Sequence, residues 1–430
     1  MDELEALDHL DSLINYEVVP RAGAIEGLSL EPMQAFMGAV GDPQHAYPVI
    51  HITGTNGKGS TSRMIERILT VMGLRVGLYT SPHLHDVTER IRVGGEDISA
   101  EDFGLAIADV VRVEEVQGLG PRTWFDTVTS AALLHFANEA VDVAIVEVGM
   151  LGRFDSTNVV HADVAVITNV SRDHTDGEAG WRDRVAAEKA GIVEAGRPVV
   201  IGEADLRPFV EAEEPGPVVA VGEEVRLRRN ELAVGGRLIE VETPRGTHED
   251  VFVRLHGEHQ GTNAALAIAA VEEFFDAALG EDIVTEAFDT IEVPGRLHVV
   301  HTAPTVLVDA AHNVAGAAAL ATAVREEFGS GSRRVLVLGM QDGRDPVQVL
   351  TALDAASFDV VVVCTAPTAR GVDADALAAA ADTVGARADV VVDVEAALDH
   401  AMGLAAEDDL VVVAGSTTVV AAALRLADDW

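Results

Sequence analysis

A glycine-rich loop that carries a lysine and a serine is the segment of this sequence with the clearest chemical potential. The run Gly54-Thr55-Asn56-Gly57-Lys58-Gly59-Ser60 stands between an expected strand and an expected helix. Backbone N–H groups in such a loop, together with the positive end of the helix that follows, attract phosphate. The spacing departs from the usual GxxxxGKS/T pattern, since fewer residues precede Gly57-Lys58 and Gly59 follows the lysine. The loop predicts a nucleotide site in which Lys58 faces the β- and γ-phosphates and Ser60 lies near the phosphates or Mg²⁺.

The scarcity of lysine supports this prediction. Lys58 and Lys189 are the only lysines among 30 lysine and arginine residues. A lysine amine can lose its proton and react, whereas arginine stays charged, so the surviving lysines indicate tasks that arginine cannot perform. The plain alternatives are a glycine-rich turn with an incidental lysine and a surface Glu188–Lys189 pair. The scarcity favours function at both positions, and a neutral Lys189 amine could combine with CO₂ to form a carbamate that binds Mg²⁺.

Two further polar groups follow expected strands. Glu147 ends an apolar strand at the edge where ligands gather in parallel sheets, and a carboxylate there suits Mg²⁺. A charged side chain that simply reaches solvent is the alternative. Asp173 and His174 also follow a strand, and on their own they fit turn residues better than ligands.

The elements that must position these residues alternate between strands and helices. Residues 2–18 have leucines at helical spacing and predict an amphipathic helix. Residues 217–256 predict β-hairpins, and a helix is expected over 260–275. Short runs rich in Val and Ile predict buried parallel strands at Val49–Ile52, Val76–Leu78, Val143–Val148, Val164–Asn169 and Val199–Ile201, with a helix over Thr61–Met72.

A second series of strands begins beyond the segment 291–300. Its expected strands are Val306–Asp309, Val335–Leu338, Asp359–Cys364, Asp389–Val392 and Leu410–Ala414. We therefore expect an α/β fold with two domains: a P-loop ATPase domain with a β-hairpin insertion over residues 1–295, and a smaller Rossmann-like α/β domain over residues 296–430.

Composition excludes several classes of function. The net charge of −41 leaves no basic face for nucleic acid, and the acidic residues are spread as in a salt-adapted protein from a halophile. The single cysteine, Cys364, permits no internal disulfide, which fits a reducing cytosol. No apolar run reaches the roughly 18–20 residues needed to span a bilayer. We expect a cytoplasmic protein, and a monomer, with neither nucleic-acid nor membrane partners.

Taken together, these residues resemble the folylpolyglutamate synthase/dihydrofolate synthase family, a branch of the Mur ligases, over almost the whole chain. The resemblance implies ATP-dependent ligation of L-glutamate to dihydropteroate, a folate or tetrahydrofolate through an acyl phosphate. Its motifs are TGTNGKGS (53–60), TSPHLHDVTERIRVGG (80–95), VDVAIVEVGMLGRFDSTNVV (141–160), EKAGI (188–192), HGEHQGTNAALA (256–267), VPGR (293–296) and DAAHNVAG (309–316).

The resemblance also implies roles for individual residues. Ser81 and Glu147 would bind one Mg²⁺ ion, and His174 with carbamylated Lys189 a second, so these last three and Lys58 form the expected catalytic set. K⁺ is a further candidate ion. ATP would contact Thr55, Asn56, Gly57, Lys58, Gly59, Ser60, Asn263, Arg296 and Asp309. L-glutamate would bind near His312 and Asn313. The residues that match the pterin pocket are Gly27, Leu28, Ser29, Thr123, Trp124, Phe125, Asp126, Arg153, Phe154 and Asp155.

Departures from the family pattern gather around the pterin pocket. Gly27-Leu28-Ser29 replaces GLE, residues 123–126 read TWFD where TFFE is usual, and residues 149–158 differ from GLGGRLDATN. The acceptor therefore stays open: dihydropteroate, a folate, another pterin or a cell-wall precursor. The SPHL…ERI segment favours folate. A P-loop ATPase without ligase chemistry, or a nucleotide-binding module without chemistry, would leave the second domain or the set Glu147, His174 and Lys189 unexplained.

Overall fold

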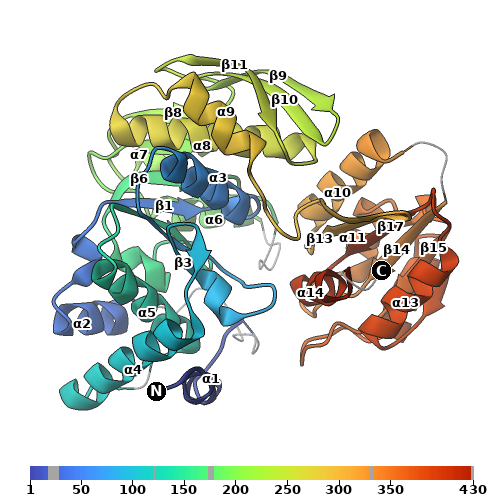
Figure 1. The fold of residues 1–430 in the computed structure, drawn as a ribbon, viewed down its shortest axis with the longest axis horizontal. Coiled ribbons are helices and arrows are strands. Elements are labelled where there is room, and N and C mark those ends of the chain that lie inside the picture. Colours follow the sequence, from blue (N-terminus) through green and yellow to red (C-terminus); the bar gives the residue numbers. More distant parts are fainter. Residues whose placement is uncertain (18–28, 121, 173–178, 330–332, 428–430) are drawn as a thin grey trace.

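The computed structural model of the chain describes residues 1–17, 29–120, 122–172, 179–329 and 333–427 (Figure 1). Within these ranges eight strands form one sheet in the order β4-β3-β2-β5-β1-β6-β7-β8. All neighbours pair in parallel except β2–β3 and β3–β4, which are antiparallel. The strands are β1 (Val49–Thr53), β2 (Val76–Tyr79), β3 (Ile91–Val93), β4 (Glu96–Asp97), β5 (Val143–Glu147), β6 (Ala162–Ile167), β7 (Val199–Ile201) and β8 (Val218–Ala220).

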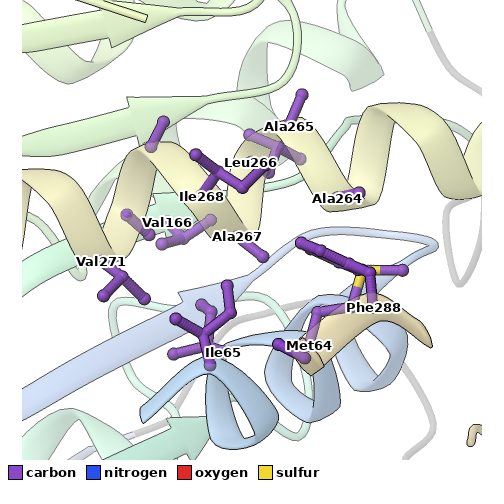
Figure 2. Packing of buried hydrophobic residues seen from close by; sticks show 14 of the residues in the cluster. Met64, Ile65, Val166, Ala264, Ala265, Leu266, Ala267, Ile268, Val271 and Phe288 are labelled. Carbon is purple, nitrogen blue, oxygen red and sulfur yellow. The ribbon is translucent and has the colours of Figure 1, made fainter. Parts of the chain in front are cut away.

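Helices bury both faces of this sheet. On one face α3 (Lys58–Val71), α8 (Glu258–Phe275) and α9 (Glu281–Asp289) pack together, with Met64, Ile65, Ile268 and Phe288 meeting in the core (Figure 2). Because successive strand residues point to opposite faces, the alternate residues of the same strands contact the other helices. These are α1 (Glu3–Asp11), α2 (Glu31–Ala39), α4 (Ala100–Gln117), α5 (Trp124–Asn138), α6 (Trp181–Ala190) and α7 (Arg207–Glu211).

The predicted hairpins form a small antiparallel sheet of three described strands, β9 (Arg226–Ala233), β10 (Gly236–Glu242) and β11 (Thr247–Val253). The hairpin prediction is wrong for its first part, because Val218–Ala220 joins the parallel sheet as β8. Val219 and Ala220 are buried there, so an all-apolar strand gains more from the covered sheet than from a hairpin.

Beyond residue 297 six described strands form a third sheet in the order β12-β13-β17-β14-β15-β16. Helices again cover both faces, so the predicted α/β architecture is confirmed (Figure 1). An antiparallel edge strand, β12, was not predicted. The elements are β12 (His298–Thr302), β13 (Thr305–Asp309), α10 (Val314–Glu327), β14 (Arg334–Leu338), α11 (Pro346–Ala352), β15 (Val360–Val363), α12 (Ala374–Thr383), β16 (Ala388–Val390), α13 (Val394–Leu404), β17 (Leu410–Ala414) and α14 (Thr417–Leu426).

The helix predicted over residues 2–18 is shorter than expected. It ends at Asp11 and buries Ala6 and Leu10, while Leu4 and Ile14 are exposed. The Ile14 carbonyl instead accepts a hydrogen bond from the Trp124 N–H, at 3.0 Å. The helix predicted from the spacing of the leucines is therefore too long at its C-terminal end. Residues after Asp11 leave the helical conformation, and the Ile14 carbonyl bonds to the first residue of α5 instead.

A buried ionic cluster joins α10 to the hairpin sheet. Glu327 on α10 accepts hydrogen bonds from the Arg237 guanidinium at 3.0 Å and the Gly257 N–H at 2.9 Å, and lies 2.8 Å from His256 Nδ1. The side chains of Arg237 and Glu327 are 6% and 2% exposed. This cluster fixes where the third sheet and its helices meet the larger part of the molecule.

The central strands of the large sheet end level with one another. Ile52 pairs with Glu147 across β1 and β5, and Thr53 pairs with Ile167 across β1 and β6. The loops after these three strands therefore lie side by side at one edge. No helix in the described part of the chain is both long and apolar enough to cross a membrane.

Candidate active site

The glycine-rich loop joins the end of β1 to the start of α3. Gly57 has a φ of 84°, and a Cβ atom there would come within 2.6 Å of the Asn263 Oδ1 atom, so glycine is required. The loop after β6 braces it: Thr55 N–H donates to the Asn169 carbonyl and Asn56 N–H to Asn169 Oδ1, both at 3.0 Å. These bonds hold the loop at the N-terminus of a helix, the end that attracts phosphate.

Glu147 lies beside this loop at the end of β5. Its side chain is 3% exposed, accepts a hydrogen bond from the Ser81 N–H at 3.4 Å and lies 3.9 Å from Lys58 Nζ. Burial raises the pKa of Glu147 above its ordinary value, although the Lys58 ammonium opposes the increase. A buried carboxylate whose contacts with Ser81 and Lys58 are this long is suited to bind a divalent cation.

Among the described residues no group of three or more His, Cys, Asp or Glu side chains could hold a metal ion. Mg²⁺ commonly takes one or two carboxylates and completes its shell with substrate phosphates and water. Glu147, with Ser81 close by, fits that pattern.

Lys189 is buried on α6, directly behind the loop. Its ammonium donates a hydrogen bond to the Gly54 carbonyl at 2.9 Å, and the residue is 4% exposed. The carbonyl of the neighbouring Glu188 accepts a hydrogen bond from the Arg153 N–H at 2.9 Å. Both lysines of the chain thus contact or adjoin the glycine-rich loop. His174, the other predicted ligand, lies outside the described residues.

The loop after β13 of the third sheet contacts the glycine-rich loop. Asn313 Nδ2 donates to Asn56 Oδ1 at 2.9 Å, and Asn56 Nδ2 approaches Asn313 Oδ1 at 3.4 Å. The two side chains are 257 residues apart in sequence. His312 lies next to this pair, and its Nδ1 lies 2.8 Å from the Ala310 carbonyl, which can only accept, so Nδ1 carries a proton.

The remaining predicted ATP contacts surround this junction. Asn263 is buried on α8 and bonds to Gln260 at 2.9 Å. Asp309 accepts the Leu297 and Ala311 N–H groups, both at 2.8 Å, so its carboxylate shapes its own loop. Arg296 is half-buried, and its charge, like that of Lys58, opposes the increase that burial causes in the Glu147 pKa.

The predicted pterin residues divide into two groups. Thr123 and Asp126 cap α5 reciprocally, and Ser156 donates to Asp126, which places the start of α5 against the segment after β5. Phe125 packs on Gly149, where a Cβ atom would come within 2.5 Å of the ring. These contacts bring the start of α5 and the loop 149–157 together.

The other predicted pterin residues are less closely associated. Arg153 pairs with Glu213, and Phe154 is 38% exposed. The Asp155 carboxylate accepts the Met150 and Thr157 N–H groups, and burial raises its pKa. Ser29 is exposed, and Gly27 and Leu28 lie outside the described residues.

Sequence analysis missed Arg90, which lies within the motif of residues 80–95. It is 1% exposed, and its guanidinium lies 4.6 Å from the Trp124 ring. It donates to both carboxylate oxygens of Glu17, at 2.9 and 2.6 Å, and to His83 Nδ1 at 2.9 Å. Burial raises the pKa of Glu17, but the Arg90 charge outweighs this and lowers it overall. The signal in the sequence was its place in the motif, directly before the short strand Ile91–Val93.

Comparisons with known proteins agree with this geometry. Residues 52–271 match the family model described as Mur ligase middle domain, and residues 295–417 match that of the Mur ligase, glutamate ligase domain. A dihydrofolate synthase/folylpolyglutamate synthase of Mycobacterium tuberculosis is 40% identical over 82% of this chain and 77% of that protein. A probable bifunctional folylpolyglutamate synthase/dihydropteroate synthase of Haloferax volcanii is 35% identical over 98% of this chain, which spans 50% of that relative.

Solved structures are similar over the whole chain. The folylpolyglutamate synthase of M. tuberculosis complexed with ADP has a TM-score of 0.90 and 35% identity, with 99% of each chain covered. The E. coli FolC in complex with DHPP and ADP has a TM-score of 0.87 and 29% identity over 100% of this chain and 98% of that one. A bifunctional synthase with Mn, AMPPNP and L-glutamate bound has a TM-score of 0.85 and 28% identity over 99% and 98%.

Proposed function

The chain belongs to the folylpolyglutamate synthase/dihydrofolate synthase family of Mur ligases, and from this premise we propose how its residues perform the reaction. It is an ATP-dependent ligase that joins glutamate to a folate. In our proposal the acceptor carboxylate attacks the γ-phosphate of ATP, which releases ADP and leaves an acyl phosphate. The amino group of L-glutamate then attacks the acyl carbon, phosphate leaves, and an amide forms.

The observation that carries this proposal is the meeting of three groups at one loop. Lys58 belongs to the glycine-rich loop, the buried carboxylate of Glu147 lies 3.9 Å from Lys58 Nζ, and the Asn313 amide after β13 of the third sheet donates to Asn56 Oδ1 at 2.9 Å. Lys58 would hold the β- and γ-phosphates as charge moves during transfer. Asn313 and His312 would hold L-glutamate on the opposite side, where its amine can reach the acyl phosphate.

Two Mg²⁺ ions are part of the proposal. Ser81 and Glu147 would hold one, and His174 with carbamylated Lys189 the other. The chemistry that bound Mg²⁺ supplies is neutralisation of charge on the transferring phosphate. The position of Lys189 supports this role, because its side chain is buried and its amine lies 2.9 Å from the Gly54 carbonyl, directly behind the glycine-rich loop.

Water must be kept away from the acyl phosphate, which hydrolyses readily. The Asn56–Asn313 pair supports a mechanism in which contact between the two domains closes the site before transfer. Since one chain supplies both sides of this contact, we propose a monomer that works in the cytosol, where ATP and glutamate are available.

The acceptor is tested directly with dihydropteroate and with tetrahydrofolate. Each is incubated with the protein, ATP, L-glutamate, Mg²⁺ and bicarbonate in concentrated KCl, and the products are weighed by mass spectrometry. We expect one glutamate on dihydropteroate and successive additions to tetrahydrofolate, which would make the protein bifunctional. If ATP binds but neither acceptor gains mass, the ligase acts on another acceptor, such as a different pterin.

A further inference from the structure

His51 is a buried imidazole in the strand that leads into the glycine-rich loop. Within Val49–Thr53 the polar residues are His51 and Thr53, and both are 0% exposed. Residues two apart in a strand point to the same face, so these two side chains share one face of β1. Ile50 and Ile52 face the opposite side, toward α3 and α8.

Both polar side chains bond to the loop after β5, residues 149–157. Thr53 Oγ1 donates to the Leu151 carbonyl at 2.5 Å, and His51 Nε2 lies 3.0 Å from Thr157 Oγ1. Thr157 Oγ1 in turn lies 2.6 Å from Asp155 Oδ1. Strand β1 is therefore joined to the loop 149–157 by two side-chain hydrogen bonds.

The hydrogen bonds define which nitrogen of His51 carries the proton. The Thr157 hydroxyl has one hydrogen, and the Asp155 carboxylate can only accept, so that hydrogen points to Asp155. Thr157 Oγ1 must then accept from His51 Nε2–H. His51 Nδ1 has no hydrogen-bond partner among the described residues, and burial lowers the pKa of His51 to about 3, so the ring is neutral.

The loop 149–157 contains a strained backbone conformation and a close contact. Leu151 has a φ of 63°, in the left-handed region that side chains disfavour. Gly149 lies against Phe125, and the Met150 N–H donates to Asp155 at 2.8 Å. Such a loop needs external anchors, and it forms one wall beside the start of α5, where the acceptor is proposed to bind.

We infer that His51 is a positioning residue for the acceptor, which acts through Thr157 and Asp155 to set the shape of the loop 149–157. The inference rests on the proposed function. It also gives β1 two tasks, since the strand that ends in the phosphate loop carries the support of the acceptor loop. A merely structural histidine would change stability and leave recognition of the acceptor unaltered.

The test compares His51→Leu, which cannot donate, with His51→Gln, whose amide can donate from a similar position. We expect His51→Leu to raise KM for the acceptor about tenfold, the value of one hydrogen bond near its upper range, with kcat and KM for ATP little changed. His51→Gln should restore KM toward that of the unaltered enzyme. An unchanged KM in His51→Leu, or an equal loss in both variants, would overturn the inference.

A second pair of variants, at Thr157, tests the same inference if the His51 variants do not fold. Thr157→Val removes the hydroxyl and Thr157→Ser keeps it, so only the valine variant should raise KM for the acceptor. Nitrogen-15 spectra of the histidine-labelled protein should show His51 as the neutral Nε2–H form, and an Nδ1–H form would also overturn the inference. If the unaltered enzyme extends neither acceptor, it is the proposed function that fails. An active enzyme with unaffected variants refutes this inference alone.

Discussion

Lys58 and Lys189 define the chemistry at the scale of single residues. One is partly exposed beside a buried carboxylate, and the other is buried behind the same loop. A protein that uses arginine at its other basic positions keeps lysine at these two, which both adjoin the proposed path of the phosphate.

Replacing Lys58 with alanine should slow glutamate addition at least about a hundredfold, because one preorganised donor to a charged transition state is worth about 10²–10³ in kcat. Lys58→Arg is the matched control, since it keeps the charge but not the compact ammonium, and it should stay well below the unaltered rate. The rate is measured by mass spectrometry at saturating substrate. A Lys58→Ala rate close to normal would remove this residue from the site.

Replacing Lys189 with alanine should abolish activity, and a small added carboxylate such as formate or acetate should restore part of it. The added anion would occupy the position proposed for the carbamate beside Gly54. Lys189→Arg fills the same space with a permanent cation, so we expect no rescue there. Full activity of Lys189→Ala without any rescue agent would contradict the carbamate role.

Elements formed by local sequence were predicted well. The strands β1, β5, β6, β7 and β17 appear close to their predicted places, because a short Val/Ile run between polar turns indicates a buried strand without knowledge of its neighbours. The glycine-rich loop lies between β1 and α3 as predicted, since its glycines, lysine and serine are contiguous in the sequence, and its role in phosphate binding stays a prediction.

What the sequence left hidden depends on contacts between distant segments. The end of α1 is set by Trp124, the pairing of Glu17 with Arg90 spans 73 residues, and the Asn56–Asn313 pair spans 257. His51 went unnoticed because a single polar residue in an apolar strand is identified as an anchor only when Thr157 is placed beside it. The roles of the pterin residues likewise depend on which of them face a common space.

The turn into α3 permits a sharp test at the scale of an element. Gly57→Ala should weaken ATP binding at least about tenfold, because the added methyl group meets Asn263 Oδ1 and the backbone is left-handed. Gly73→Ala is a matched control, since its φ of 87° carries the same backbone cost but nothing lies within 4 Å of the new atom. Calorimetric titration with ATP separates the two, and equal affinities would show that the contact with Asn263 does not matter.

At the scale of the whole molecule, the Glu327 cluster joins the domains. Burial raises the pKa of Glu327, but His256, the Gly257 N–H and Arg237 lower it overall, below its ordinary value of 4.5. A carboxyl whose folded pKa is lowered stabilises the fold above its unfolded pKa, and that contribution disappears as the pH falls through the folded pKa.

Glu327→Gln should therefore lower the free energy of unfolding by about 3 kcal/mol near neutral pH, as expected when a buried pair is broken. The difference from the unaltered protein should shrink as the pH falls below about 4.5. Glu326→Gln, at the exposed neighbouring position, is the control and should have little effect. Denaturant titrations over a pH series provide the measurement, and a difference that grows in acid would contradict the assigned cluster.

The placement of the two lysines also allows occupancy of the glycine-rich loop to be followed by chemical modification. The Lys58 side chain is 17% exposed, whereas Lys189 is 4% exposed. An acylating reagent aimed at side-chain amines therefore has one accessible target, and that target lies at the start of α3, in the loop proposed to bind phosphate. Bound nucleotide should shield it, so the extent of modification of a single peptide would report occupancy of the loop without any engineered label. The same scarcity means that crosslinkers and surface coupling directed at lysine side chains would modify the residue that the proposed mechanism places against the phosphates of ATP.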